Sequence, residues 1–210
     1  CGVHISKCKY WNSVLSSLNN PLAYEINNTE NFSSNNYEMI KKILKKSGKK
    51  FFLESSKNFD RLKKLIKSKL FKITVIHLVR DGRAVAYSSQ RKQNRLRNRL
   101  SSSYSKELLN MNKKSDFYDF YTSILRWNRE NLYYYKKFQK DSEISYLLIK
   151  YEDIVTRPKE VIYEIIDNFD LEFEEQQLKF YELIHHNLAG NRMRMATHGS
   201  IFWMKNIRKH

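Results

Sequence analysis

Residues 73–89 read Ile-Thr-Val-Ile-His-Leu-Val-Arg-Asp-Gly-Arg-Ala-Val-Ala-Tyr-Ser-Ser, and this stretch decides the fold. Its first seven residues form a nearly continuous apolar run rich in β-branched side chains, which predicts a strand buried on both faces in a parallel sheet. The run ends at Arg80, and Asp81 is a good N-cap for a helix that carries Ser88. A strand end, a basic turn and a helix N-terminus together predict an anion-binding site.

Bulk composition sets the limits of the interpretation. The chain has 210 residues, enough for a single domain over residues 1–210 with a sizeable core. It carries 39 Lys and Arg against 22 Asp and Glu, a formal net charge of +17. This excess suits a nucleic acid, an acidic membrane surface, or an anionic cofactor and substrate. The chain is also rich in Asn and Tyr, so the charge permits an anionic partner without selecting one.

Several classes of protein are disfavoured. No apolar run approaches the length of a membrane-spanning helix, and no signal-peptide pattern stands at the start. The two cysteines, Cys1 and Cys8, are too few for a disulfide framework or a zinc site. We therefore expect no membrane span, no metal, and a reducing, cytoplasmic location.

The rest of the chain alternates apolar strands with amphipathic helices, which predicts an α/β domain with a mainly parallel sheet in a three-layer sandwich. Residues 117–140 carry aromatic and aliphatic side chains over much of a helix circumference, so we expect a largely buried helix with Trp127 in the core. Residues 19–36 are predicted to be a long loop, and residues 101–116 a mobile insertion that covers an acceptor site. The expected strands are 51–54, 73–79 and 145–151, and the expected helices are 10–18, 37–46, 61–66, 117–140 and one opened by Pro158.

Arg80 and Ser88 also carry a family resemblance. Their frame, Leu-Val-Arg-Asp-x-Arg-Ala-Val-x-x-Ser, resembles the motif with which sulfotransferases hold the 3'-phosphate of 3'-phosphoadenosine 5'-phosphosulfate (PAPS). The resemblance implies that both side chains bind this phosphate. Gly82 stands where the family usually has proline, and we expect it to loosen the turn without removing a ligand.

Residues 54–57, Glu-Ser-Ser-Lys, resemble a second element of the family. In relatives a His or Glu near this point takes the proton of the acceptor hydroxyl, so the resemblance implies that Glu54 is the catalytic base and that Lys57 stabilises negative charge. This role suits Glu54 if partial burial raises its pKa toward neutrality. The alternative is that Glu54 pairs with Lys57 or caps a helix.

Two further motifs follow in the family's order. Tyr151 opens a Tyr-Glu-Asp-x-x-x-x-Pro segment, and the resemblance implies that its ring borders the adenine of PAPS. Glu152 and Asp153 are expected to anchor this turn. Arg194 ends a Gly-Asn-x-x-Arg segment that precedes the loop which closes over the 3'-phosphate in relatives.

The first residues resemble a bacterial branch of the family, through Cys1-Gly2, Cys8 and Tyr10-Trp11. In that branch this stretch follows a phosphosulfate-binding loop, and the sequence holds no such loop. We therefore expect a fragment of a P-loop-NTPase-like fold that lacks the first strand and the C-terminal end and is inactive by itself. The complete enzyme would move a sulfuryl group from PAPS to a hydroxyl or amine of a small-molecule, lipid or carbohydrate acceptor and release 3',5'-ADP without a metal.

Other classes remain open. A P-loop phosphotransferase would need a Walker lysine and a magnesium-binding carboxylate, and neither is found. A basic nucleic-acid-binding module would explain the net charge and the arginine-rich residues 90–100. In the sulfotransferase interpretation, Arg91 and Arg95 instead share the helix face of Ser88 and extend the positive field toward the donor or toward an acidic acceptor. Nucleic acid is then not expected as a partner. A non-catalytic nucleotide-binding module is the third alternative.

Overall fold

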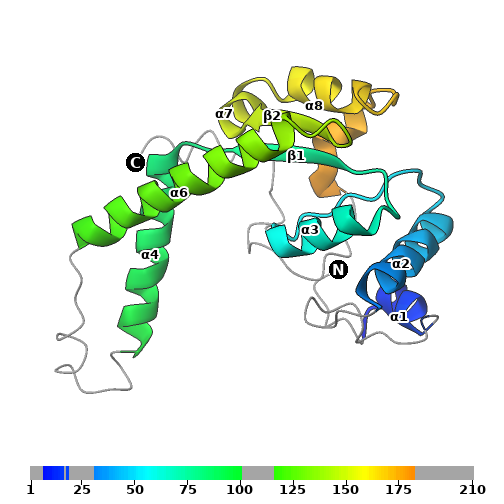
Figure 1. The fold of residues 1–210 in the computed structure, drawn as a ribbon, viewed down its shortest axis with the longest axis horizontal. Coiled ribbons are helices and arrows are strands. Elements are labelled where there is room, and N and C mark those ends of the chain that lie inside the picture. Colours follow the sequence, from blue (N-terminus) through cyan, green and yellow to red (C-terminus); the bar gives the residue numbers. More distant parts are fainter. Residues whose placement is uncertain (1–6, 17, 19–30, 101–115, 183–210) are drawn as a thin grey trace. The chain divides into compact units, whose positions relative to one another are not determined.

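The structure is a computed structural model of the chain, and it describes residues 7–16, 18, 31–100 and 116–182 (Figure 1). Arg194 and nearly all of the predicted insertion at 101–116 lie outside the described residues, as do the side chains of residues 93–100. The chain divides into two compact units. We call Thr74–Glu174 the sheet unit, and Cys1–Ile73 with Glu175–His210 the N-terminal unit. The single domain over residues 1–210 stays a prediction.

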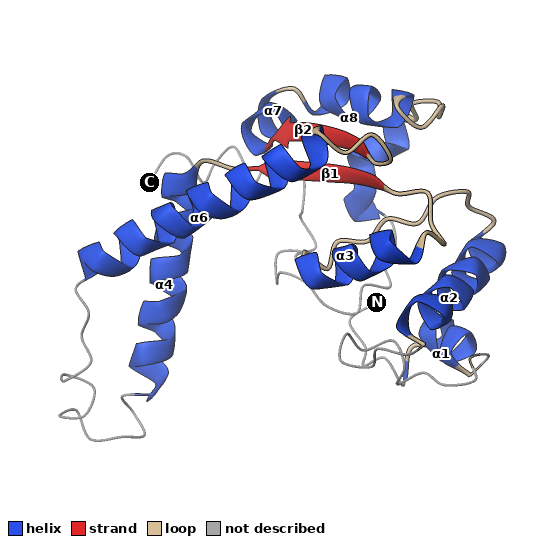
Figure 2. Cartoon of the chain, viewed as in Figure 1, coloured by secondary structure: helices blue, strands red, loops and turns tan. Residues whose placement is uncertain are grey.

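Where the structure describes it, the sheet unit contains two parallel strands, β1 (Thr74–Val79) and β2 (Ser145–Lys150). Their register pairs Thr74 with Ser145 and Val79 with Lys150, so the two strands end side by side (Figure 2). Two of the three predicted strands and their parallel pairing are therefore confirmed. The burial of β1 on both faces is not, because Leu78 is 49% exposed and no residue of β1 is fully buried. Only one strand borders β1 in the described part of the chain, which leaves much of its surface open.

The described residues of the sheet unit also form four helices: α4 (Gly82–Leu100), α6 (Asp116–Gln139), α7 (Tyr151–Thr156) and α8 (Pro158–Asp167). The α6 helix crosses the sheet, contacts both strands and packs against α4 (Figure 2). Pro158 occupies the first turn of α8, as predicted. The burial expected for α6 is wrong along one face, where large side chains are about half exposed: Tyr118, Tyr121, Leu125 and Leu132.

The N-terminal unit is helical where it is described, with α1 (Lys9–Leu15), α2 (Phe32–Ser47), α3 (Phe59–Ser68) and a 3-10 segment η3 (Glu175–Glu182). Gly48 ends α2 in the left-handed conformation, with φ of 65°, as the sequence predicts. The α2 helix begins at Phe32, so residues 32–36, which were predicted to be the end of a long loop, are helical. The buried apolar residues of this unit are Cys8, Val14, Leu18, Phe32, Ile43 and Leu65.

The strand predicted at 51–54 is wrong. Residues 51–58 have no regular secondary structure, and the side chain of Leu53 is 81% exposed. No described strand lies beside this segment to pair with it, so its apolar residues alone do not make it a strand. The chain is nevertheless an α/β protein with a parallel sheet, as predicted, while the three-layer, P-loop-like arrangement stays a prediction.

Candidate anion-binding site

The carboxyl ends of β1 and β2 bring Arg80 and Tyr151 together. Each residue directly follows its strand, and the last residues of the two strands are paired partners. The guanidinium carbon of Arg80 lies 4.9 Å from the centre of the Tyr151 ring, a cation–π contact. Two residues that the sequence places 71 positions apart are thus neighbours at the edge where α/β sheets bind their ligands.

Arg80 differs from the nearby Arg83 and Arg157 because it has no carboxylate partner among the described residues. Arg83 forms an ion pair of 2.6 Å with Asp81, and Arg157 pairs with Asp153 at 3.6 Å. Among the described residues, no carboxylate pairs with Arg80, whose side chain contacts the Tyr151 ring instead. A guanidinium has five N–H donors, and a contact over a ring leaves them free for an oxygen-rich anion.

The acidic residues of the turn hold the backbone. The Oδ1 atom of Asp81 accepts a hydrogen bond of 2.8 Å from the backbone N–H of Arg83, which confirms the predicted N-cap of α4. Hydrogen bonds from the side chain and backbone of Arg83 lower the pKa of Asp81 to about 2. The backbone N–H of Asp81 in turn donates to Oε1 of Glu152, at 3.2 Å. This contact confirms that Glu152 anchors the turn, since it joins the end of β1 to α7.

Ser88 lies on α4 with its side chain exposed. It is seven positions after Asp81, which is two helical turns along the same face. Thr122 and Thr156 donate their hydroxyls to backbone carbonyls in their own helices. Among the contacts within the described chain, Ser88 makes no such bond, so its hydroxyl is free to donate to a ligand. Its role as a phosphate ligand stays a prediction.

Gly82 has a different role from the one expected. A Cβ at this position would lie 2.7 Å from Cε3 of Trp127 and 2.9 Å from Cδ2, closer than side chains pack. The indole of Trp127 therefore rests directly on the first residue of α4. Glycine does not simply loosen the turn, because it allows α6 to approach it. Trp127 packs against α4, but it is only partly buried and is not one of the core residues, so its predicted place in the core is not confirmed.

Glu54 belongs to a polar cluster in the N-terminal unit. Its Oε1 atom accepts hydrogen bonds from Nε of Arg61 at 2.5 Å and from the hydroxyl of Ser56 at 2.6 Å, and its Oε2 atom accepts from Nη2 of Arg61 at 3.0 Å. Burial raises the pKa of Glu54, but the hydrogen bonds from Arg61 and Ser56 and the charge of Arg61 lower it further, so the pKa lies below its ordinary value. The expected rise toward neutrality is not met.

The alternative roles considered for Glu54 are also changed. Its partner is Arg61 rather than Lys57, and the N-cap of α3 is Asn58, whose side chain accepts the backbone N–H of Arg61 at 3.0 Å. Lys57 is exposed and has a positive φ of 56°. The sequence therefore identified an acidic residue that is ion-paired but assigned it the wrong partner.

The residues that hold Arg61 in place were not predicted. Its Nη2 atom donates to Oδ1 of Asn36 at 2.6 Å, and its guanidinium carbon lies 5.1 Å from the centre of the Phe32 ring. Asn36 is fully buried, and its Nδ2 atom donates to the carbonyl of Phe32 at 2.6 Å. Because residues 19–36 were predicted to be a polar loop, nothing in the pattern marked Asn36 as a core residue.

Among the described residues, no group of three or more His, Cys, Asp or Glu side chains is arranged to hold a metal ion. None of the helices in the described ranges is both long enough and apolar enough to cross a membrane.

The described residues form an α/β protein in which an arginine with no carboxylate partner among them lies beside a tyrosine at the carboxyl edge of the sheet. A family model described as "Sulfotransferase family" matches residues 19–175, well over half of the sequence, so the chain belongs to the sulfotransferase family. The match includes Glu54, Arg80, Ser88 and Tyr151 and ends before Arg194. Searches of curated proteins and of solved structures found no match. Family membership supports an enzyme that transfers sulfuryl groups.

Proposed function

We propose that the protein transfers a sulfuryl group from PAPS to a hydroxyl or amine acceptor and that Arg80 binds the 3'-phosphate of this donor. The observation that carries the proposal is the Arg80 guanidinium at the carboxyl edge of the sheet, which lies over the ring of Tyr151 and has no carboxylate partner among the described residues. A phosphate dianion suits a planar guanidinium, because two N–H groups can donate to two oxygens at once.

The residues around Arg80 fit the rest of a nucleotide. Ser88 provides a hydroxyl two helical turns into α4, on the same face as Asp81. Tyr151 provides a flat aromatic surface for adenine. The first turn of α4 adds the partial positive charge of a helix N-terminus. Arg194 is proposed as a further phosphate ligand on the family resemblance alone.

The proposed reaction is an in-line displacement at sulfur. The acceptor oxygen or nitrogen forms a bond to sulfur while the bond from sulfur to the 5'-phosphate oxygen breaks, which gives the sulfonated acceptor and 3',5'-ADP. The acceptor loses one proton in this step. The leaving 5'-phosphate gains negative charge that basic side chains can stabilise, so the proposal includes no metal.

Glu54 is proposed to receive the acceptor proton. Its pairing with Arg61 keeps it ionised at neutral pH, so it is ready to accept a proton, and its Oε2 atom has one described hydrogen bond and a lone pair to spare. A low pKa makes it a weak base. It would therefore take the proton late, as the bond from oxygen to sulfur forms. Lys57 is proposed to stabilise negative charge nearby.

Binding measurements on the complete protein test the donor. Titration calorimetry should show that 3',5'-ADP binds more tightly than 5'-ADP, which lacks only the 3'-phosphate. We expect a preference of at least about tenfold, because one charge-assisted hydrogen bond contributes about 1.5–3 kcal/mol. Equal affinity for the two nucleotides would reject the proposed donor site. Tight, steeply salt-dependent binding of any polynucleotide without this preference would instead support a nucleic-acid-binding module.

A further inference from the structure

The α6 helix contacts the chain on both sides of Arg80. Before the arginine, Oδ1 of Asn131 lies 2.9 Å from Nε2 of His77, which is in β1. After the arginine, the ring of Trp127 rests on Gly82, at the start of α4. Trp127 and Asn131 are four residues apart, about one helical turn or 6 Å of rise. One turn of α6 therefore contacts the chain at His77 and at Gly82, the two positions that flank Arg80.

The hydrogen bonds around His77 are directional, and they assign its protons. Nδ2 of Asn131 donates to the carbonyl of Trp127 at 2.7 Å, so the amide oxygen faces His77. His77 must then donate through Nε2, and its Nδ1 accepts from the hydroxyl of Tyr146, 2.7 Å away in β2. Both nitrogens of a half-buried imidazole are satisfied. The arrangement fixes the position of α6 against both strands.

The contact at Gly82 depends on steric fit, whereas the contact at His77 depends on hydrogen bonds. Its Cα meets the face of an indole with no room for a side-chain atom, so a small sliding movement of α6 would either open a gap or produce a clash. The Trp127 ring and the Asn131 amide belong to the same rigid helical turn. A movement of α6 at one contact is therefore transmitted to the other.

We propose that Asn131 and Trp127 are positioning residues for the nucleotide site: together with His77 they fix the backbone of the segment from which Arg80 extends. Neither residue is proposed to contact the phosphate itself. Tyr151 and Glu152 hold the same segment from the start of α7, so α6 and α7 both support the turn. This inference rests on the proposed function, since the position of Arg80 matters for catalysis only if the arginine binds the donor.

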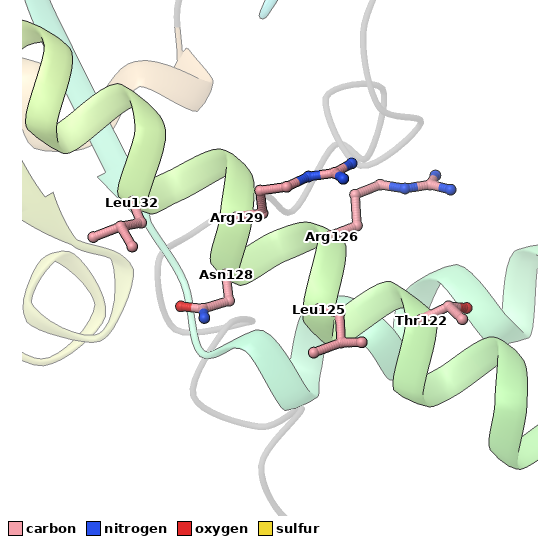
Figure 3. Close-up of a pocket in the computed structure, with 6 residues that line it drawn as sticks. All are labelled: Thr122, Leu125, Arg126, Asn128, Arg129 and Leu132. Carbon is pink, nitrogen blue, oxygen red and sulfur yellow. The ribbon is translucent and has the colours of Figure 1, made fainter.

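A neighbouring exposed position on α6 provides a matched control. Figure 3 shows Asn128 among the residues that line a shallow, open pocket formed along this helix. Asn128 is the same residue type as Asn131, on the same helix and three positions away, and its side chain makes no hydrogen bond to the described chain. All lining residues come from α6, which marks this pocket as an open helix face: Thr122, Leu125, Arg126, Asn128, Arg129 and Leu132.

The first experiment compares Asn131→Leu with Asn128→Leu in the complete protein. We expect Asn131→Leu to weaken 3',5'-ADP binding about tenfold, the effect of roughly 1.4 kcal/mol of coupling between contacting groups, while Asn128→Leu leaves it unchanged. A merely structural Asn131 would lower the melting temperature without changing the affinity of the folded protein. That result would overturn the inference, even if the wild-type protein bound 3',5'-ADP as proposed.

A second pair of variants covers the case in which Asn131→Leu does not fold. The amide of glutamine can replace Nε2 of an imidazole, and the shorter asparagine can replace Nδ1. His77→Gln keeps the donor toward Asn131, and His77→Asn keeps only the contact with Tyr146. We expect His77→Gln to retain most of the affinity and His77→Asn to lose it. Equal affinities in the two variants would overturn the inference.

Hydrogen exchange separates this inference from the proposed function, because it needs no nucleotide. In the ligand-free protein, backbone amides 83–86 in the first turn of α4 should exchange faster in His77→Asn than in His77→Gln. Faster exchange with no 3',5'-ADP binding in the wild-type protein would reject the donor site and, with it, the positioning of Arg80 for that donor. Unchanged exchange would show that α6 does not hold the turn.

Discussion

Removal of the Arg80 side chain is the most direct perturbation of the proposed donor site. In Arg80→Ala the turn should keep its shape, because its backbone is held by Asp81, Glu152 and the Trp127 contact rather than by the guanidinium. The fold would lose one exposed cation–π contact, worth about 0.5–1 kcal/mol. A stable protein with a defective anion site is therefore expected.

The expected loss of affinity follows from what Arg80 would donate. Hydrogen bonds to a charged group contribute about 1.5–3 kcal/mol, so Arg80→Ala should weaken 3',5'-ADP binding roughly 10- to 150-fold. Arg80→Lys keeps the charge and loses the planar fork, and we expect an intermediate affinity. Binding of 5'-ADP should hardly change in either variant, since this nucleotide lacks the phosphate in question.

Isothermal titration calorimetry at about 0.15 M salt measures these affinities where long-range electrostatics are screened. Arg83→Ala is the matched control, because Arg83 lies three positions away, carries the same charge and is paired with Asp81. It should reduce affinity less than about twofold, as expected for an exposed, screened charge that already has a carboxylate partner. If Arg80→Ala and Arg83→Ala had equal effects, the net charge of the protein rather than a specific ligand would account for binding.

Three further predictions concern other parts of the structure. Glu54→Gln should greatly reduce turnover and leave 3',5'-ADP affinity unchanged in calorimetry; an equal loss of both would indicate a structural role through Arg61. Gly82→Ala should lower the free energy of unfolding by about 1–3 kcal/mol in denaturant titration, because its Cβ meets Trp127, and adding Trp127→Leu should recover part of this loss rather than add to it. The folded-state pKa of Asp81 is lowered from 3.8 to about 2, so its contribution to stability is present above pH 3.8 and is lost as pH falls toward 2. The melting temperature of Asp81→Asn should therefore lie below that of the wild-type protein at pH 7, and the difference should vanish near pH 2, whereas a constant difference would contradict the assigned pKa.

The sequence predicted the elements whose signals are local. The apolar run before Arg80 and the N-cap at Asp81 mark a strand end and a helix start within a few residues, and both are present. Glycine after α2 and proline at the start of α8 are equally local signals. The pairing of Arg80 with Tyr151 is different, because it depends on the register of strands about 70 residues apart. Family resemblance, rather than local pattern, placed both residues at one site.

The errors arise where a residue's environment depends on distant parts of the chain. The aromatic side chains of α6 cover much of its circumference, and this pattern cannot show which face meets the sheet, so exposed Tyr121 was expected in the core. Phe51 and Leu53 are apolar enough for a strand but have no described strand beside them. The pKa of Glu54 was expected to rise because burial alone was considered. Arg61, seven positions later and supported by buried Asn36, reverses the direction.

The proposed chemistry assigns different tasks to the two units. Arg80, Ser88 and Tyr151 belong to the sheet unit and would bind the donor, while Glu54 belongs to the N-terminal unit and would accept a proton. Substitutions in the sheet unit should therefore act on donor affinity, and those at Glu54 on turnover at saturating donor. A binding site without catalysis would respond only to the first group. Separate effects on affinity and on turnover would thus distinguish a sulfotransferase from a non-catalytic nucleotide-binding module. Binding of the 3'-phosphate alone would not distinguish them.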